Sequence, residues 1–247
     1  TRRDLEIEYG GSMKVVVNCR WELDAYPETP TGMTIYLFRE GESSPSVFST
    51  PRVNSYELSL NAGRYRLYII SQSVDDYEGT LIFKDMDSFG KARATLVENA
   101  SSWYSRYTKA GDEPISVNPE NIAVGVSEEF EITEQMIEEY ETFYRKYEHK
   151  RIYDPRNGLS ETDDGEKIEY RTIEIPVSPR NIVSQLWVTV YADQADNLRS
   201  VRAATTGMAR TIALTSASTA HESSIQVLDH WSLDLDTKAS RVGRLDG

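Results

Sequence analysis

The chain has 247 residues, which is enough for two domains of roughly 120 residues or for one large β-sandwich. Its 40 acidic and 27 basic residues give a formal charge of -13. Because binding to nucleic acid depends on cationic side chains, we expect no nucleic-acid partner. The single cysteine, Cys19, excludes an intramolecular disulfide and a zinc site built on several thiolates.

The first predicted strands alternate apolar and polar side chains with a period of two. From residue 13 to 23, one face carries Met13, Val15, Val17, Cys19, Trp21 and Leu23. This pattern predicts a strand that packs on one side, with Trp21 in the core and Cys19 as an inert buried thiol. Residues 33–38 are apolar on both faces, which predicts a central strand with partners on either side.

A β-hairpin is predicted between Tyr56 and Ile69. Alternating apolar residues lie on both sides of Asn61-Ala62-Gly63, and Gly63 can adopt the positive φ of a tight turn. Further short strands are predicted at 81–83, 92–97 and 122–126, with the spacing of a β-sandwich.

Between residues 127 and 167 the composition changes, and a helix is predicted. Thr133 can cap it, acidic residues follow in its first turns, and the apolar face repeats every 3.6 residues through Met136, Tyr140, Phe143, Tyr144 and Tyr147. Because tyrosine-rich sequence also favours strands, an irregular insert after a strand at 122–132 is the alternative. Residues 154–166 predict a solvated loop.

The second half returns to strand periodicity. We expect strands at 169–175, ended by Pro176 to Pro179, and at 186–191, where Trp187 is predicted to be in the core. Four more candidates follow at 201–204, 210–214, 225–228 and 231–235. The charged end, residues 240–247, shows no clear strand pattern. No alternation of helices and strands occurs, which excludes parallel α/β folds.

The predicted fold is therefore all-β, with two tandem β-sandwich domains. The first spans residues 1–128 and the second spans 129–247, with a helical and loop insert at 133–167. No apolar run of 18 residues occurs, and the sequence opens at Thr1-Arg2-Arg3-Asp4, so we expect that any export signal was removed ahead of this numbering.

Two series of motifs occur in a set order. The first half carries Val15-Val16-Val17 with Trp21, then Pro30-Thr31-Gly32-Met33-Thr34-Ile35-Tyr36-Leu37-Phe38, then Ala62-Gly63-Arg64-Tyr65. The second half carries Pro179-Arg180-Asn181-Ile182, Leu186-Trp187-Val188-Thr189-Val190, Val201-Arg202-Ala203, Gly207-Met208-Ala209 and Leu214. Both series resemble the fimbrillin superfamily, in particular the minor-fimbrial anchor proteins and related uncharacterised lipoproteins of Bacteroidales.

That resemblance implies two transthyretin-like Greek-key sandwiches in a protein exported to the cell surface. It also implies an outer-membrane lipoprotein, anchored through an N-terminal cysteine, that anchors or assembles surface filaments. Other fimbrial subunits would join it by β-strand addition. The lipidated cysteine and its signal are missing from this sequence, so lipid anchoring is implied by the resemblance alone.

Residues suited to catalysis are sparse. The three histidines are His149, His221 and His230. None has a ligand partner at three- or four-residue spacing, and no nucleophile motif accompanies them, so we expect them to be surface or packed side chains. The pairs Asp75-Asp76 and Asp163-Asp164 could serve glycoside hydrolysis, but with 40 acidic residues such pairs arise by chance. The loop at 163–166 lacks the ligand spacing of a calcium site. We expect no enzyme activity, no cofactor and no metal.

The stretch Trp103-Tyr104-Ser105-Arg106-Tyr107 is the candidate contact surface. Aromatic side chains with a polar group bury a large area at low entropic cost, so Trp103, Tyr104 and Tyr107 are predicted to contact a partner or ligand. The alternative is that Trp103 and Tyr104 plug the end of a sandwich.

The predicted function is a fimbrial accessory or anchor protein; the alternatives are a surface glycan-binding lipoprotein using exposed aromatics and, third, a hydrolase.

Overall fold

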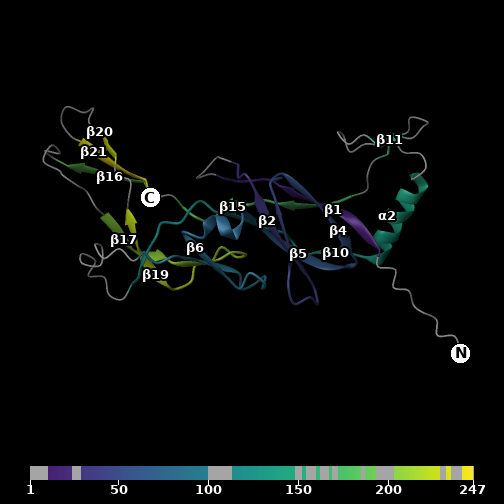
Figure 1. Cartoon of the computed structure of the whole chain (residues 1–247), viewed down its shortest axis with the longest axis horizontal. Helices are drawn as coiled ribbons and strands as arrows, with labels where there is room; N and C mark the ends of the chain where they lie inside the picture. Colours follow the sequence, from purple (N-terminus) through teal and green to yellow (C-terminus); the bar gives the residue numbers. More distant parts are fainter. Residues whose placement is uncertain are drawn as a thin grey trace.

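The computed structural model describes residues 11–23, 29–99, 113–147, 152–153, 160–161, 167–168, 172–184, 187–192, 203–228, 232–234 and 241–246. The described part consists mostly of β-strands in several sheets, with one α-helix (Figure 1). The predicted all-β sandwich architecture is confirmed. Neither this helix nor the short 3-10 helix beside the sheets has the length and apolar character needed to cross a membrane.

The first sheet has three strands in the order β14-β1-β4. Strand β1 (Ser12–Cys19) pairs antiparallel with β4 (Ser55–Asn61) and parallel with β14 (Ile173–Val177). The side chains predicted to point inward do so, since Met13, Val15 and Val17 are buried. Trp21 packs against the same core, and its indole Nε1 donates a hydrogen bond to the carbonyl of Val53 at 2.7 Å.

The second sheet is the middle layer. Its path runs β15 (Arg180–Asn181), β9 (Ala123–Val126), β5 (Gly63–Ser71), β2 (Met33–Arg39) and β3 (Ser46–Thr50), and β10 (Phe130–Ile132) also pairs with β5. Residues 33–37 of β2 are all buried, because this strand has neighbours on both edges and packing on both faces. The predicted central strand is therefore confirmed.

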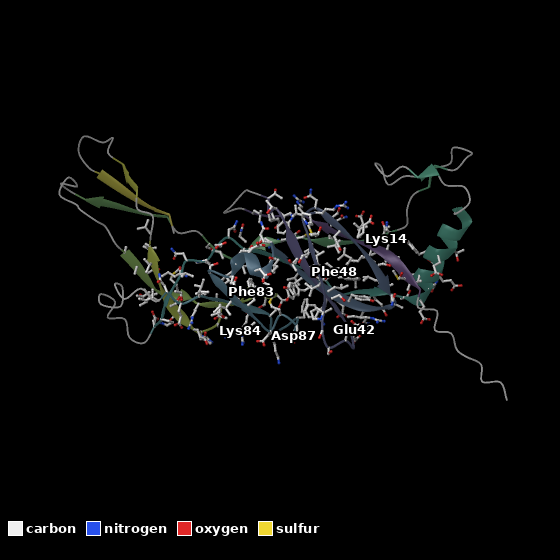
Figure 2. The ribbon with its side chains drawn as sticks, viewed as in Figure 1. Lys14, Glu42, Phe48, Phe83, Lys84 and Asp87 are labelled. Carbon is white, nitrogen blue, oxygen red and sulfur yellow. The ribbon has the colours of Figure 1, made fainter. Side chains whose placement is uncertain are left out.

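A third layer covers the other face of the middle sheet. It contains β6 (Leu81–Lys84), β7 (Arg93–Leu96) and β18 (Thr211–Ala213), with η1 (Val74–Tyr77) beside it. Tyr36 and Tyr68 of the middle sheet face this layer and stack with ring centroids 4.8 Å apart. The first core, between the first sheet and the middle sheet, includes Val15, Leu58 and Ile69, and the second core, between the middle sheet and the third layer, includes Tyr68 and Leu96. Figure 2 shows the side chains of both cores filling the central part of the molecule, with Phe48 of β3 and Phe83 of β6 labelled.

The predicted hairpin is wrong. Strands β4 and β5 follow each other directly, but β4 pairs with β1 and β5 pairs with β2, so the chain crosses between two sheets at Ala62. The backbone at Gly63 has a φ of 159°, which is extended. Arg39 fills the crossing: its Nη2 donates to the Ala62 carbonyl at 2.6 Å, and a Cβ at Gly63 would lie 2.7 Å from its Nε. Gly63 thus permits a close approach of a side chain.

The predicted helix is confirmed as α2 (Glu134–Tyr147), and the alternative of an irregular insert is wrong. The backbone N–H of Met136 donates to the Thr133 hydroxyl at 3.2 Å, as expected of an N-cap. Ile137 is buried in the first core, and Met136 and Tyr140 pack against it. Helix α2 lies beside β1 at one end of the molecule (Figure 1).

The strands near the C-terminus form smaller sheets. One has the order β17-β19-β8, from β17 (Ala203–Ala209), β19 (Ser223–Leu228) and β8 (Ile115–Ser116). Another has the order β16-β21-β20, from β16 (Trp187–Ala192), β21 (Arg241–Asp246) and β20 (Ser232–Asp234). The side chain of Trp187 lies outside the described part, so its predicted core position stays a prediction.

Three expectations for this half need correction. Strand β21 occupies the end that was predicted to have no strand, because its arginines and aspartate conceal the strand pattern in the sequence. Strand β14 continues through Pro176 to Val177, which an edge strand tolerates because one side of its backbone makes no ladder bonds. Within the predicted loop at 154–166, β12 (Ser160–Glu161) pairs with β11 (Ile152–Tyr153) and β13 (Lys167–Ile168).

The division at residues 128 and 129 stays a prediction, and strand pairing crosses it. Strands β10, β14 and β15 follow the boundary in sequence but complete sheets built by residues 12–126, and β18 pairs with β7. In the structure, β10, α2, β14, β15 and β18 therefore pair or pack with the strands of residues 12–126.

Candidate functional site

Several predicted site residues lie outside the described part of the chain. These are the aromatic candidates Trp103, Tyr104 and Tyr107, and also His149, His230, Asp163 and Asp164. The predicted aromatic contact surface therefore stays a prediction. His221 is exposed in the segment before β19.

Asp76, of the pair Asp75-Asp76, has a structural role. The Asp76 carboxylate accepts hydrogen bonds from the backbone N–H and the hydroxyl of Ser73, at 2.8 Å and 2.9 Å, and so caps η1. The backbone bond and then the hydroxyl bond lower the pKa of Asp76. In the described ranges, no group of three or more His, Cys, Asp or Glu side chains is arranged to hold a metal ion.

Cys19 is held as a thiol. Its Sγ lies 3.7 Å from the Sδ of Met33, and burial raises its pKa to about 12. The side chain is partly buried against the first core, as its inward position in the alternation predicted. A thiol with so high a pKa is a poor nucleophile at neutral pH.

The chain changes sheets at Arg210, between β17 and β18. The Arg210 N–H donates to the carbonyl of Glu222 at 3.1 Å, and its carbonyl accepts from the N–H of Leu96 at 2.9 Å. One continuous segment thus pairs first with β19 and then with β7. The two sheets therefore meet at Arg210.

An open pocket of about 170 Å³ lies at this sheet change. Leu81 and Leu96 from the third layer are buried in its wall, while Ile182, Met208 and Ile212 are partly buried and accessible from the pocket. Most of the lining is aliphatic, namely Leu81, Ala94, Leu96, Pro119, Ile122, Ile182, Val183, Met208, Ala209 and Ile212. The pocket can therefore take an apolar side chain or a short apolar segment.

The lining of this pocket also includes the polar residues Arg210 and Thr211. Arg210 forms an ion pair with Glu98, with Nη2 2.6 Å from Oε1, while its Nε is buried without a partner among the described residues. The hydroxyls of Thr95 and Thr211 are hydrogen bonded at 3.0 Å. No pattern in the sequence predicts this pocket, because its lining comes from segments that are far apart in the chain.

Two strand edges have no paired neighbour among the described strands. Among the described strands, β17 pairs with β19 alone, and its last residues Met208 and Ala209 line the pocket. Strand β3 is an edge of the middle sheet, with the side chain of Val47 51% exposed and with Pro45 and Pro51 flanking it. Prolines next to an edge strand hinder the addition of another strand there.

A family model for a domain of unknown function, DUF5119, matches residues 1–229. The chain belongs to this family. A comparison with curated proteins finds no match. The fold is similar to that of a candidate adhesin from Bacteroides ovatus, with a TM-score of 0.58 and 12% identity over 100% of this chain and 70% of the other.

Two further solved structures are similar. A candidate adhesin from Bacteroides thetaiotaomicron has a TM-score of 0.52 and 8% identity, over 97% of this chain and 72% of the other. The fimbrial anchor protein Mfa2 of Porphyromonas gingivalis has a TM-score of 0.49 and 12% identity, over 96% and 73%. The two Bacteroides structures share the fold of this chain, as the predicted resemblance implied.

Proposed function

We propose that this DUF5119 protein is a non-enzymatic cell-surface protein that acts in adhesion, as an accessory or anchor subunit of a surface filament. Its fold is that of candidate adhesins from Bacteroides, which supports a surface role. The fimbrial accessory role, the lipid anchor and an outer-membrane location rest on the sequence resemblance.

The apolar pocket at the sheet change is the observation that carries the proposal. A strand donated by another subunit would form main-chain hydrogen bonds with the free edge of β17 and place an apolar side chain in the pocket. Complete burial of one aliphatic side chain contributes about 1.5–3 kcal/mol, to which the main-chain bonds add. Such a joint would be stable without a covalent bond.

The position of the pocket suits an anchored protein. Strand β1 begins beside α2 at one end of the elongated molecule, and β17 lies towards the other end (Figure 1). A lipid attached ahead of β1 would therefore leave the pocket directed away from the membrane and accessible to a filament subunit.

Site-specific photo-crosslinking in the producing cells tests this proposal. A photoreactive residue at Met208, in the pocket, is expected to crosslink to a strand of a surface-filament subunit, while the same residue at Val47 on β3 is the matched control. Ile212→Asp should abolish incorporation into filaments, and Val47→Asp should leave it intact. Equal crosslinking from both positions, or filaments that form normally with Ile212→Asp, would refute strand addition at this pocket.

A further inference from the structure

A second pocket, of about 190 Å³, opens where the middle sheet ends. It lies between the segment that leads into β2, the end of β5, η1 and the start of β9. Charged residues make up 27% of the chain, yet the nine described residues that line this pocket are all uncharged. We propose that it binds one residue of a neutral sugar.

One wall of this pocket is a fixed hydrogen-bond network. The Tyr77 hydroxyl donates to the Ser71 carbonyl at 2.9 Å, and the Ser71 hydroxyl oxygen accepts from the backbone N–H of Ala123 at 2.9 Å. Burial raises the pKa of Tyr77 to about 12, so the hydroxyl stays protonated and neutral at physiological pH. The wall is thus rigid before any ligand arrives.

Two amide side chains offer hydrogen bonds to a ligand. The Asn121 Oδ1 accepts from the side chain of Asn181, which leaves the Asn121 Nδ2 without a hydrogen-bond partner in the described part of the chain. The Gln72 Nε2 donates to the hydroxyl of Thr31 at 3.0 Å, in an exposed bond that a ligand hydroxyl can replace. Both amides can therefore donate to or accept from sugar hydroxyls.

The backbone holds Gln72 in a conformation that favours glycine. Its φ is 60°, in the left-handed region, which is unfavourable for a residue with a side chain. The Gln72 N–H donates to the Gly32 carbonyl and its carbonyl accepts from the Thr34 hydroxyl, each at 2.8 Å, so the conformation is fixed from both sides. Strained backbone of this kind is common at ligand-binding sites. At this position it places the side-chain amide of Gln72 at the pocket.

The lining chemistry selects the ligand class. Leu23, Pro30 and Ala123 supply apolar surface for the C–H groups of a ring, and the amides supply hydrogen bonds for its hydroxyls. An acidic ligand would find no cation among the described lining residues, and a purely apolar ligand would leave the amides unpaired. The volume equals that of about six waters at ~30 Å³ each, which suits one ring rather than an oligosaccharide.

This pocket and the apolar pocket at the sheet change have no described lining residue in common. Sugar binding and strand addition can therefore be tested separately, and the failure of one leaves the other unaffected.

Saturation-transfer NMR and ¹H–¹⁵N titrations of the full chain test the proposal. The probes are D-glucose, D-galactose, D-mannose and N-acetyl-D-glucosamine, with D-glucuronate as the charged comparison. At least one neutral sugar is expected to receive saturation and to shift the backbone amides of Gln72, Tyr77 and Asn121, while glucuronate does neither. If no neutral sugar binds at millimolar concentrations, or if glucuronate binds equally well, the proposal is wrong.

Two variants separate binding from folding. Gln72→Gly removes the amide and suits the left-handed backbone, so stability should hold or rise while affinity falls about tenfold. Asn121→Asp keeps an oxygen for the Asn181 donor but removes the free N–H donor, and it should weaken binding similarly. Gln135→Ala, on the exposed face of α2, is the control and should bind as the unmodified chain does. Unchanged affinity in both pocket variants would overturn the assignment.

Discussion

Gly125 in β9 lies directly beneath the chain that leads from β14 to β15. A Cβ at this position would lie 2.6 Å from Cγ1 of Val177 and 2.9 Å from the backbone nitrogen of Pro179. Because a backbone atom and a buried side chain would both have to move, Gly125→Ala should lower the free energy of unfolding by about 1–3 kcal/mol. Urea unfolding followed by circular dichroism measures this change.

Gly79 provides the matched control. A Cβ there would meet nothing within 4 Å, and the residue is exposed. Gly79→Ala should leave the free energy of unfolding unchanged or raise it by up to about 1 kcal/mol, because alanine restricts the unfolded chain. Equal effects of the two substitutions would show that the contact with Val177 and Pro179 does not matter.

Cys19 yields a prediction about reactivity. Burial raises its pKa from 9.0 to about 12. At pH 8 the thiolate fraction should fall from about one in ten in the unfolded chain to about one in ten thousand in the folded chain. A thiolate of higher pKa is also more nucleophilic, so the pKa alone should make the aromatic disulfide reagent DTNB label the native protein about 30–60-fold more slowly than the protein in guanidinium; similar rates would contradict the burial.

The raised pKa of Cys19 also makes the stability of the protein depend on pH. The folded state favours the protonated thiol, so the resulting contribution to stability is complete below pH 9 and is lost as the pH rises towards 12. Cys19→Ala should show a smaller loss of stability than the unmodified chain over this range.

The alternating pattern of the sequence predicts which side chains point inward, but it does not predict which residues they contact. Met13, Val15 and Val17 are buried as predicted, because a strand against a core has only one possible apolar face. The bond from Trp21 to the Val53 carbonyl and the Arg39 contact at Ala62 depend on how separate strands are stacked. Likewise, the residues of both pockets come together only in the folded chain.

The role of Thr133 as the N-cap of α2 can be tested by substitution. Its hydroxyl accepts from the N–H of Met136, so Thr133→Ala should cost about 0.5–2 kcal/mol of stability. Thr133→Ser keeps the hydroxyl and should cost much less. Urea unfolding midpoints for both variants check the expectation, and an equal loss for alanine and serine would point to the methyl group instead of the cap.

At the scale of elements, the positions of strands were predicted better than their pairings. Strands β4 and β5 both carry alternating apolar side chains towards the first core, and this pattern fits two strands facing each other across a core as well as two strands in a hairpin. Helix α2 was predictable because a cap and a 3.6-residue repeat coincide. Strand β21 was missed because its partners β16 and β20, and not its own composition, determine its structure.

For the whole molecule, the pairing across residue 128 gives a prediction about truncation. Residues 1–128 alone would lack Ile132, Ile137, Ile175 and Val177 of the first core and the parallel partner of β1. This fragment should show no cooperative unfolding transition, whereas the full chain should show one. A cooperative transition in the fragment, with a dispersed NMR spectrum, would support a domain boundary at 128.

The parallel pairing of β1 with β14 also constrains when the protein can fold. Glu22 and Arg180, which extend this pairing with a bridge, are 158 positions apart. At a synthesis rate of about 5–20 residues per second, β1 would wait roughly 8–30 s before its partner leaves the ribosome. An early strand with an unpaired edge is a binding site for chaperones. The nascent chain should therefore depend on them until β14 has left the ribosome.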